Sequence, residues 1–476
     1  MSSSKNGEGV HVLLIPYPAQ GHILAILDFT HQLALRGITI TVLITPKNLP
    51  ILDPLLSTHP SIQTLLLPFP AGHALLPAGV EHVKDVGNWG NAPIISSLSR
   101  LRAPVVEWFG SHPNPPTAII HDFFSGWAQD VAREIGVPGI CFNSTSALLV
   151  CVLDCAWKRI KGLKGMEVVG FPEIPDSPRF ERDHLPSIMK NYKESDPDWE
   201  AVRRVMVGNT GSWGFVVNTF GGLEGKYLEW LEKKKKEEEE NGNPRPRVFS
   251  VGPLSLIGVP YGGGGDHRSL FSWLDGCPDE SVLYVAFGSQ KLMKKPQLEA
   301  LSIGLENSGV RFVLVVKEPT VEQVEQGYGS IPVGFEDRVT GRGLVIRGWA
   351  PQVEILSHRA VGGFLSHCGW NSTLEAIAAG VLILGWPMEA DQYVNVRLLV
   401  DELEVSVRVS EGADTVPDIT ELARIISESM NGHIAEKVRA KELRDKACDA
   451  VKVGGSSIKA LDELVEQLSQ LNSPSK

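Results

Sequence analysis

The architecture of this chain can be inferred from one segment, Gly362-Gly-Phe-Leu-Ser-His-Cys-Gly-Trp-Asn-Ser-Thr-Leu-Glu-Ala-Ile-Ala-Ala379. It begins with an apolar run ending at Leu365, continues through a small polar turn at 367–372, and ends in helix formers at 373–379. A strand, a tight turn and a helix in this order are typical of a parallel sheet covered by helices. The first helical turn directs backbone N–H groups towards the carboxyl edge of the strands, so the segment predicts a phosphate site.

The same alternation of apolar runs and helical patterns occurs in both halves of the chain. Strands are expected at 10–15, 38–44, 118–120, 281–287, 310–316, 344–346, 362–365 and 381–384. Helices are expected at 23–35, 147–157 and 297–308. Parallel strands joined by helices predict an α/β fold made of two doubly wound halves.

The length and the local composition suggest where the domains lie. A chain of 476 residues is too long for one hydrophobic core, so a cleft between domains is expected. Four lysines followed by four glutamates at 233–240 predict a solvated loop or a frayed helix end. We expect an N-terminal domain at 1–250 and a C-terminal domain at 251–455. Apolar residues at helical spacing in 456–476 predict a terminal helix that packs back on the N-terminal domain.

The overall composition excludes several classes of partner. The 45 basic residues minus the 56 acidic residues leave a net charge of −11, which argues against nucleic acid or an anionic membrane. No run approaches the ~18 apolar residues needed to span a bilayer. The N-terminus lacks a signal-peptide core, and six cysteines in a chain of this length do not form a disulfide framework. We therefore expect a reduced, cytoplasmic, monomeric protein that does not insert into membranes.

The residues around the predicted phosphate turn are suited to a nucleotide and a sugar. Trp349 lies between Gly348 and Pro351 in an expected loop, where a flat indole suits stacking on a base. Side-chain donors to a diphosphate are available from His367, Asn371 and Ser372. Glu375 could accept hydrogen bonds from ribose hydroxyls, and the adjacent Asp391 and Gln392 match the hydroxyls of a sugar.

An alternative interpretation of the turn is purely structural. Ser372 and Glu375 have the spacing of a capping box, in which the serine satisfies the first N–H groups of the helix. On the spacing alone, the capping role and the ligand role remain equally open.

A second candidate group lies near the N-terminus. Gly21 and His22 follow the first expected strand, and Asp122 follows the strand at 118–120. Both positions lie at the carboxyl edge of a parallel sheet, where a histidine with a supporting carboxylate forms a general-base pair. Two alternatives remain: His22 could simply start a helix, and His121 could face the site in place of its neighbour.

Several segments of the sequence resemble those of a known enzyme family. The 44 residues from Trp349 to Gln392 resemble the signature box of plant secondary-product UDP-glycosyltransferases, glycosyltransferase family 1. Gly21-His22 and Phe287-Gly-Ser289 also fall where that family has them, and the likeness covers nearly the whole chain. The resemblance implies a GT-B fold, with two Rossmann-like domains facing each other across a cleft and the UDP-sugar held by the C-terminal domain.

The resemblance also implies a role for each residue of the donor site. Trp349 would stack on uracil, Ala350 would bond uracil through its backbone, and Gln352 would help Glu375 to hold the ribose. The diphosphate would be bound by His367, Asn371, Ser372 and Ser289. The sugar would be contacted by Trp370, Asp391 and Gln392. Gly21, beside the catalytic histidine, is counted among the donor-binding residues.

The implied chemistry is an inverting displacement without a cofactor. His22 would remove a proton from an acceptor hydroxyl with Asp122 as its partner, and UDP would leave. The UDP-sugar is a co-substrate, and family members need no metal because a helix dipole meets the charge of the diphosphate. Asp196 and Asp198 formally make a DxD motif, but they lie in a polar loop with no strand before them, so no metal site is expected there.

The resemblance leaves the sugar and the acceptor partly open. Gln392 at the end of the box is associated with glucose, although UDP-rhamnose, UDP-xylose and UDP-galactose remain alternatives. The expected acceptor is a small hydrophobic phenol such as a flavonoid, with a hydroxybenzoate as the alternative. Candidate walls of its pocket are Trp89, Phe123, Phe124 and Met189. Ser144 and Thr145 either reach the sugar or only start the helix at 147–157.

Two alternative functions belong to other classes, one a binding protein and the other an oxidoreductase. A nucleotide-sugar-binding protein without catalysis would not need the His22–Asp122 pair. A nicotinamide-dependent oxidoreductase would carry GxGxxG after a strand, and that motif is absent from the sequence.

Overall fold

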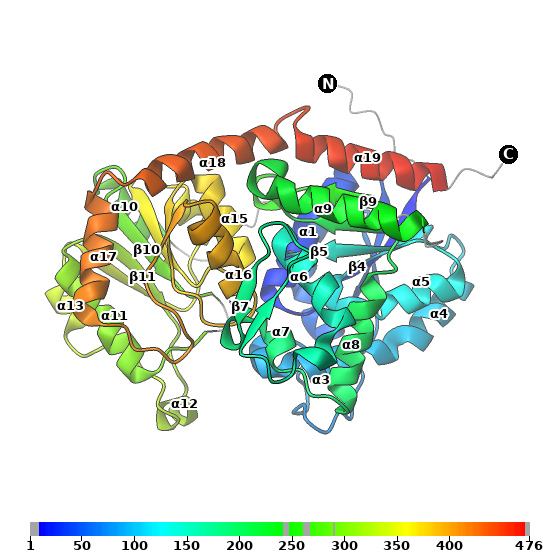
Figure 1. Ribbon diagram of the computed structural model, residues 1–476, viewed down its shortest axis with the longest axis horizontal. Coiled ribbons are helices and arrows are strands. Elements are labelled where there is room, and N and C mark those ends of the chain that lie inside the picture. Colours follow the sequence, from blue (N-terminus) through cyan, green and yellow to red (C-terminus); the bar gives the residue numbers. More distant parts are fainter. Residues whose placement is uncertain (1–8, 241–246, 260–266, 289–290, 472–476) are drawn as a thin grey trace. The chain divides into compact units, whose positions relative to one another are not determined.

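The structure analysed is a computed structural model of the chain. It describes residues 9–240, 247–259, 267–288 and 291–471, and for residues 235–240 it describes the backbone alone. The chain forms two compact units, one made of 1–261 with 446–476 and the other of 262–445. Each unit is a parallel sheet with its own helices (Figure 1).

The first unit is built on a seven-stranded sheet in the order β3-β2-β1-β4-β5-β8-β9, with every neighbouring pair parallel. Its strands are β1 (His11–Ile15), β2 (Thr39–Ile44), β3 (Gln63–Leu66), β4 (Ala118–Asp122), β5 (Gly139–Asn143), β8 (Gly214–Val217) and β9 (Arg247–Ser250). A separate antiparallel hairpin joins β6 (Val168–Gly170) and β7 (Arg179–Glu181). The strand order reverses between β1 and β4, and the carboxyl ends of strands at such a reversal form the usual ligand-binding crevice.

Helices of the first unit connect these strands. They are α1 (Gln20–Leu35), α2 (Asp53–Thr58), α3 (Asn91–Leu98), α4 (Arg102–Ser111), α5 (Ala128–Ile135), α6 (Ala147–Lys158), α7 (Ser187–Lys190), α8 (Pro197–Asn209), α9 (Gly221–Glu240) and α19 (Ser456–Leu471). Short 3₁₀ turns lie at Pro46–Leu52, Val83–Asp85, Asn88–Gly90, Ser99–Leu101, Phe123–Ser125, Ile160–Leu163, Arg182–His184 and Leu254–Leu256.

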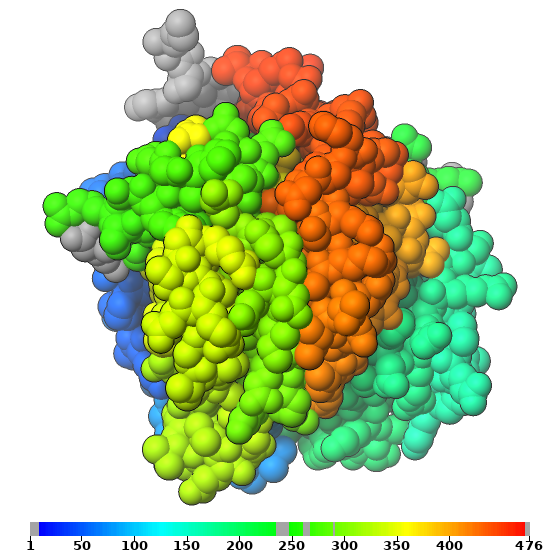
Figure 2. Space-filling view, turned by 90° about the vertical axis from the view of Figure 1, so that its left-hand side faces the viewer, coloured from blue at the N-terminus to red at the C-terminus, as the bar shows by residue number. Residues whose placement is uncertain are grey.

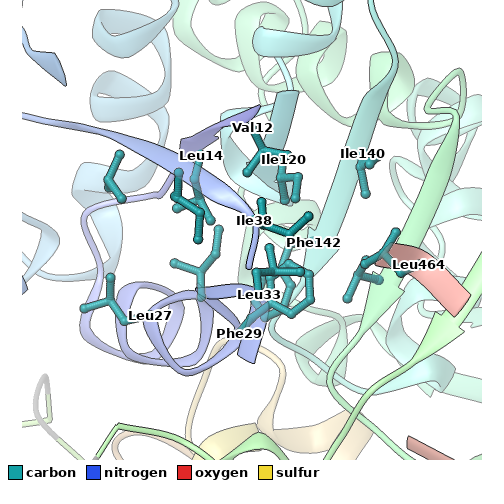
Figure 3. Close-up of a cluster of buried hydrophobic side chains, with 14 of the residues drawn as sticks. Val12, Leu14, Leu27, Phe29, Leu33, Ile38, Ile120, Ile140, Phe142 and Leu464 are labelled. Carbon is teal, nitrogen blue, oxygen red and sulfur yellow. The ribbon is translucent and has the colours of Figure 1, made fainter. Parts of the chain in front are cut away.

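The core of the first unit lies between β1, α1 and the C-terminal helix α19. Figure 3 shows Leu14 of β1, Phe29 of α1 and Phe142 of β5 in this cluster. The rings of Phe29 and Phe142 stack with centroids 5.2 Å apart. Leu464 of α19 is fully buried in the same cluster, so the end of the chain completes a core that its beginning starts.

The second unit contains a six-stranded sheet in the order β12-β11-β10-β13-β14-β15, again with parallel neighbours. Its strands are β10 (Val282–Ala286), β11 (Arg311–Val316), β12 (Gly343–Arg347), β13 (Val361–Ser366), β14 (Leu382–Gly385) and β15 (Ser406–Arg408). Its helices are α10 (Arg268–Asp275), α11 (Lys295–Ser308), α12 (Val321–Glu325), α13 (Phe335–Arg338), α14 (Gln352–Leu356), α15 (Trp370–Ala379), α16 (Gln392–Val396) and α17 (Ile419–Asn431). A π-helix follows α16 at Arg397–Glu402, and α18 (Ala435–Val451) crosses the division between the units.

Helices cover both faces of this second sheet. In Figure 1 the sheet lies between α11 and α17 on one side and α15 and α16 on the other. The α11–α17 layer is tight, since a Cβ added at Gly304 would come within 2.6 Å of Leu422. Figure 2 shows this layer from outside, with the orange segment of α17 beside the green segment of α11.

The strands and helices predicted from the sequence form at the expected places, but two details differ. Both bounds of the predicted C-terminal domain, 251–455, differ. Residues 251–259 stay with the first unit, because Val251, Leu254 and Val259 are buried in its core, and residues 446–455 also belong to the first unit. The lysine–glutamate run continues α9 to Glu240. Of the two alternatives predicted for this run, a helix end is therefore correct and a loop is not. Within the described ranges, no helix has the combination of length and apolar character needed to cross a membrane.

A pair of leucines on α19 tests the contribution of the C-terminal helix. We expect Leu464→Ala to destabilise the first unit by about 2–5 kcal/mol, because it removes a fully buried side chain and leaves a cavity. Leu471→Ala on the same helix is the control, since its side chain is 41% exposed. Thermal unfolding followed by circular dichroism should show a lower melting temperature for the first variant alone. Equal melting temperatures would contradict the packing of α19 described above.

Candidate active site

The structure brings His22 and Asp122 together at the carboxyl edge of the first sheet. β1 ends at Ile15 and α1 begins at Gln20, so the histidine lies in the first turn of α1 beside Gly21. Asp122 is the last residue of β4. The Nδ1 atom of His22 lies 3.0 Å from both carboxylate oxygens of Asp122. This edge is the reversal point of the strand order, which explains why two residues a hundred positions apart in the sequence meet there.

The surroundings of this pair fix its protonation chemistry. Asp122 is fully buried, and its Oδ1 atom also accepts a hydrogen bond from the backbone N–H of Phe124 at 2.8 Å. A carboxylate at this position holds the proton of His22 on Nδ1 and leaves Nε2 able to accept another. The imidazole stacks on Phe123, with centroids 4.9 Å apart, and its side chain remains 19% exposed. The pair is therefore arranged as a general base with one accessible edge.

Two neighbouring groups do not compete for this role. His121 lies fully buried in β4, where successive side chains point to opposite faces of the sheet. Burial lowers the pKa of His121, so it stays neutral, and the alternative in which it replaces Asp122 is not supported. Tyr17 donates its hydroxyl to Asn91 at 2.7 Å, and burial together with the Asp122 carboxylate raises its pKa well above the ordinary value.

The strand–turn–helix predicted in the second unit is formed by β13, the loop 367–369 and α15. Its N-cap is Gly369, whose carbonyl accepts from the N–H of Thr373 at 2.9 Å. Ser372 thus lies inside the first turn, and its hydroxyl accepts from Nε2 of Gln352 at 3.0 Å. The capping-box interpretation of Ser372 is therefore wrong, because the helix begins earlier than that motif requires.

His367 is held between two glycines at the start of this helix. A Cβ at Gly288 would lie 2.7 Å from Nε2 of the histidine, and a Cβ at Gly369 would lie 2.6 Å from it. Gly288 also has a φ of +76°, which disfavours any other residue. Burial lowers the pKa of His367 to about 4, and its Nδ1 atom makes no hydrogen bond within the described part of the chain. The turn thus offers a neutral imidazole, while Ser289, the neighbour of Gly288, lies outside the described residues.

The residues expected to hold a nucleoside also gather in the second unit. Trp349 follows β12 and is 54% exposed, an unusual exposure for an indole, and its ring lies 5.5 Å from that of His267. Ala350 next to it is buried. Gln352 opens α14 and donates through Nε2 to Glu375 at 2.6 Å as well as to Ser372, so it ties α14 to α15.

Glu375 has an unusual electrostatic environment. Desolvation by burial raises its pKa to about 7, although the hydrogen bond from Gln352 acts in the opposite direction. A carboxyl group with this pKa is protonated in part at neutral pH, so a ligand that donates hydrogen bonds to it would draw it into the charged form.

Asp391 and Gln392 lie where α16 begins, after β14. The Oε1 atom of Gln392 accepts from the N–H groups of Met388 and Glu389 at 2.8 and 3.0 Å. Its amide nitrogen has no partner among the described residues, so this side chain faces a ligand only as a donor. Asp391 accepts at Oδ2 from Asn395 at 2.8 Å. Asn395 was not predicted from the sequence, and its one signal there is its spacing of four residues from Asp391 on a helix.

The positions of the remaining predicted residues say less about how a ligand would bind. Trp370 is almost completely buried at the first position of α15, and Asn371 follows it. Ser146, and neither Ser144 nor Thr145, is the N-cap of α6. The hydroxyls of Ser144 and Thr145 are buried without a hydrogen-bond partner among the described residues, so their helix-start interpretation is not supported.

The structure also places the residues expected to line the acceptor pocket and the two aspartates of the DxD motif. Phe123 and Phe124 contact the ring of His22, Met189 is buried, and Trp89 is 56% exposed. Asp196 is the N-cap of α8, and Asp198 pairs with His73 at 2.9 Å. In the described ranges, no group of three or more histidine, cysteine or acidic side chains could hold a metal ion.

Comparison with known proteins identifies the family. Residues 278–430 match the model of the UDP-glucoronosyl and UDP-glucosyl transferase family. The chain is 47% identical to flavonol 3-O-glucosyltransferase UGT89B1 of Arabidopsis thaliana, over 97% of this chain and 96% of that protein. It is 38% identical to a flavonol 7-O-rhamnosyltransferase of the same plant, over 96% of this chain and 98% of the relative. The chain belongs to the plant UDP-glycosyltransferases.

Solved structures of this family agree with the fold. Arabidopsis thaliana UGT89C1 is 38% identical and superposes with a TM-score of 0.78, over 96% of this chain and 99% of that one. That protein has also been solved in complexes with UDP-L-rhamnose and with quercetin. The predicted GT-B class, with two Rossmann-like parallel-sheet units, is confirmed, and the UDP-glycosyltransferase family excludes the oxidoreductase alternative.

If Glu375 receives the ribose as the resemblance implies, its raised pKa should make UDP binding pH-dependent. Ribose hydroxyls donate better to the carboxylate than to the acid, so we expect the affinity for UDP to rise between pH 6 and pH 8 as the group ionises near pH 7. In Glu375→Gln this contribution is lost, and UDP affinity changes less over the same range. Calorimetric titration at several pH values measures the difference between the two proteins. Glu325→Gln, an exposed change on α12, should keep the wild-type slope, and a wild-type slope in Glu375→Gln would contradict the assignment.

Proposed function

We propose that this enzyme transfers glucose from UDP-glucose to a hydroxyl group of a flavonoid-type phenol, with inversion at the anomeric carbon. The observation that carries the proposal is the His22–Asp122 pair, in which a buried carboxylate fixes Nδ1 and leaves Nε2 as the accepting atom. A binding protein without catalysis has no need of a base held in this way.

In the proposed reaction, Nε2 of His22 takes the proton of the acceptor hydroxyl. The oxygen forms a bond to the anomeric carbon, the bond from that carbon to the diphosphate oxygen breaks, and UDP leaves with the electron pair. Asp122 stabilises the imidazolium that results and does not take its proton. General-base catalysis of this kind contributes about 10²–10⁴-fold.

The charge that develops on UDP needs stabilisation, and the second unit is suited to it. The N-terminus of α15 is entered through Gly369, so its backbone N–H groups and its dipole are directed at the turn. His367 adds a neutral donor beside them, and we propose that these groups act without a metal ion. Trp349 would stack on the uracil, and the Gln352–Glu375 pair would receive the ribose.

The choice of sugar is argued from the sugar-binding loop and from the relatives. Gln392 presents its amide as a donor, and Asp391 beside it supplies an acceptor, so the sugar meets one group of each kind. The relative at 47% identity is named a glucosyltransferase, which favours glucose. UDP-rhamnose is the second candidate, because the relative at 38% identity is a rhamnosyltransferase and UGT89C1 binds UDP-L-rhamnose.

The acceptor class is argued from the aromatic residues around the base. Phe123 and Phe124 lie against His22, with ring centroids 4.9 and 4.8 Å from that of the histidine, so a flat ring could pack beside the base. Both named relatives act on flavonols, and UGT89C1 binds quercetin. A flavonol is therefore the first acceptor to test, and a hydroxybenzoate is the second.

Substitution of the base is the direct test of the mechanism. We expect His22→Ala to lower kcat by about 10²–10⁴-fold, because the acceptor hydroxyl loses its proton acceptor. UDP affinity should stay close to the wild-type value. The matched control is His31→Ala on the same helix, whose ring pairs with His59 and not with Asp122. Full activity of purified His22→Ala would show that another group is the base.

A donor and acceptor panel tests the substrates. We expect the highest kcat/KM with UDP-glucose and a flavonol, measured by chromatography of the products against UDP-rhamnose, UDP-xylose and UDP-galactose. Preference for another donor would refute the assignment of glucose and leave the transfer chemistry in place. Binding of UDP-sugars without transfer to any acceptor would favour the non-catalytic alternative.

A further inference from the structure

Two turns at the carboxyl edge of the second sheet have unusual backbone geometry. Cys368, after β13, has a φ of +61°, and Ala390, after β14, has a φ of +57°. Both residues carry a Cβ, so the left-handed conformation is strained, and such strain persists only where neighbouring groups hold it. One turn leads into α15 and the other carries Asp391, so something must hold both parts of the proposed donor site.

The side chain of Asn395 joins these two turns. Its Nδ2 atom donates to the carbonyl oxygen of Cys368 at 2.9 Å and to Oδ2 of Asp391 at 2.8 Å. Asn395 is fully buried. An amide nitrogen has two hydrogens, and each is used for one turn.

Further hydrogen bonds act within each turn. Ser366 accepts from the N–H of Cys368 at 3.0 Å within the first turn. Gln392 accepts from the N–H groups of Met388 and Glu389 within the second. The π-helix at Arg397–Glu402 begins two residues after Asn395, and such irregular helices often occur at functional sites. The Asn395 amide is therefore a link of a different kind, because it spans both turns.

We propose that Asn395 is a positioning residue that couples the turn entering α15 to the carboxylate of Asp391. It holds the diphosphate-binding turn and the sugar-binding loop in one fixed relation. The part of this inference that concerns the sugar rests on the proposed function, in which Asp391 contacts the sugar. The part that concerns UDP rests on the proposed diphosphate site at the N-terminus of α15 and does not depend on which sugar is transferred.

Two variants test this role. Asn395→Ala removes both hydrogen bonds, and Asn395→Asp keeps the shape but places a second carboxylate beside Asp391. We expect the dissociation constant for UDP-glucose to rise on the order of ten-fold, and that for UDP to rise by a smaller factor. The KM for the acceptor should not change, because the acceptor is proposed to bind in the first unit. In a double variant with Asp391→Ala, the Asn395→Ala change should add little to the loss of UDP-glucose affinity. Each change alone already removes the hydrogen bond between Asn395 and Asp391.

Leu422→Ala separates positioning from simple loss of stability. This leucine of α17 is buried against Gly304 of α11, outside the proposed donor site, so the variant should lower the melting temperature without changing either dissociation constant. Unchanged affinities in both Asn395 variants would overturn the proposal, as would full additivity with Asp391→Ala. Failure of the proposed function looks different: wild-type enzyme would bind UDP but transfer no glucose. In that case weaker UDP binding by Asn395→Ala would still support the positioning role.

Discussion

In the function proposed above, binding of the sugar donor depends on the positive end of one helix dipole, that of α15. α15 begins after Gly369, a residue without a side chain, so the cap that most helices draw from serine or aspartate is absent at this position. The neighbouring residues do not neutralise the positive end of the helix. His367 fills the space between Gly288 and Gly369 and remains neutral, so it adds no charge of its own. A diphosphate would supply the negative charge that the first helical turn favours.

The two units divide the chemistry by the kind of electrostatic environment that each provides. In the first, the buried Asp122 carboxylate faces an imidazole that lies among aromatic rings. In the second, burial raises the pKa of Glu375 to about 7, and the neutral amide of Gln352 donates a hydrogen bond to it. The net charge of −11 is thus a property of the surface, while the binding groups are few and local.

Much of this arrangement could be predicted from the sequence, because periodicity and strand ends are local signals. The terminal helix expected within 456–476 forms as α19 (Ser456–Leu471), and His22 meets Asp122 because parallel strands end at one edge. The capping box at Ser372 was a wrong prediction, since spacing does not show which residue takes the extended cap conformation. Asn395 was missed because its partners, a backbone carbonyl and a carboxylate in another loop, exist only after folding.

The discontinuity of the first unit has a consequence for biosynthesis. Its core is completed by Leu461, Leu464 and Leu468, which are synthesised after the whole of the second unit, whereas the second unit is one continuous piece of chain. Domains generally fold as units during synthesis. The second unit can therefore reach its native state on the nascent chain, while the first unit, which carries His22, must wait with part of its apolar surface uncovered. Chaperone demand during synthesis should fall on the part of the protein that is made first.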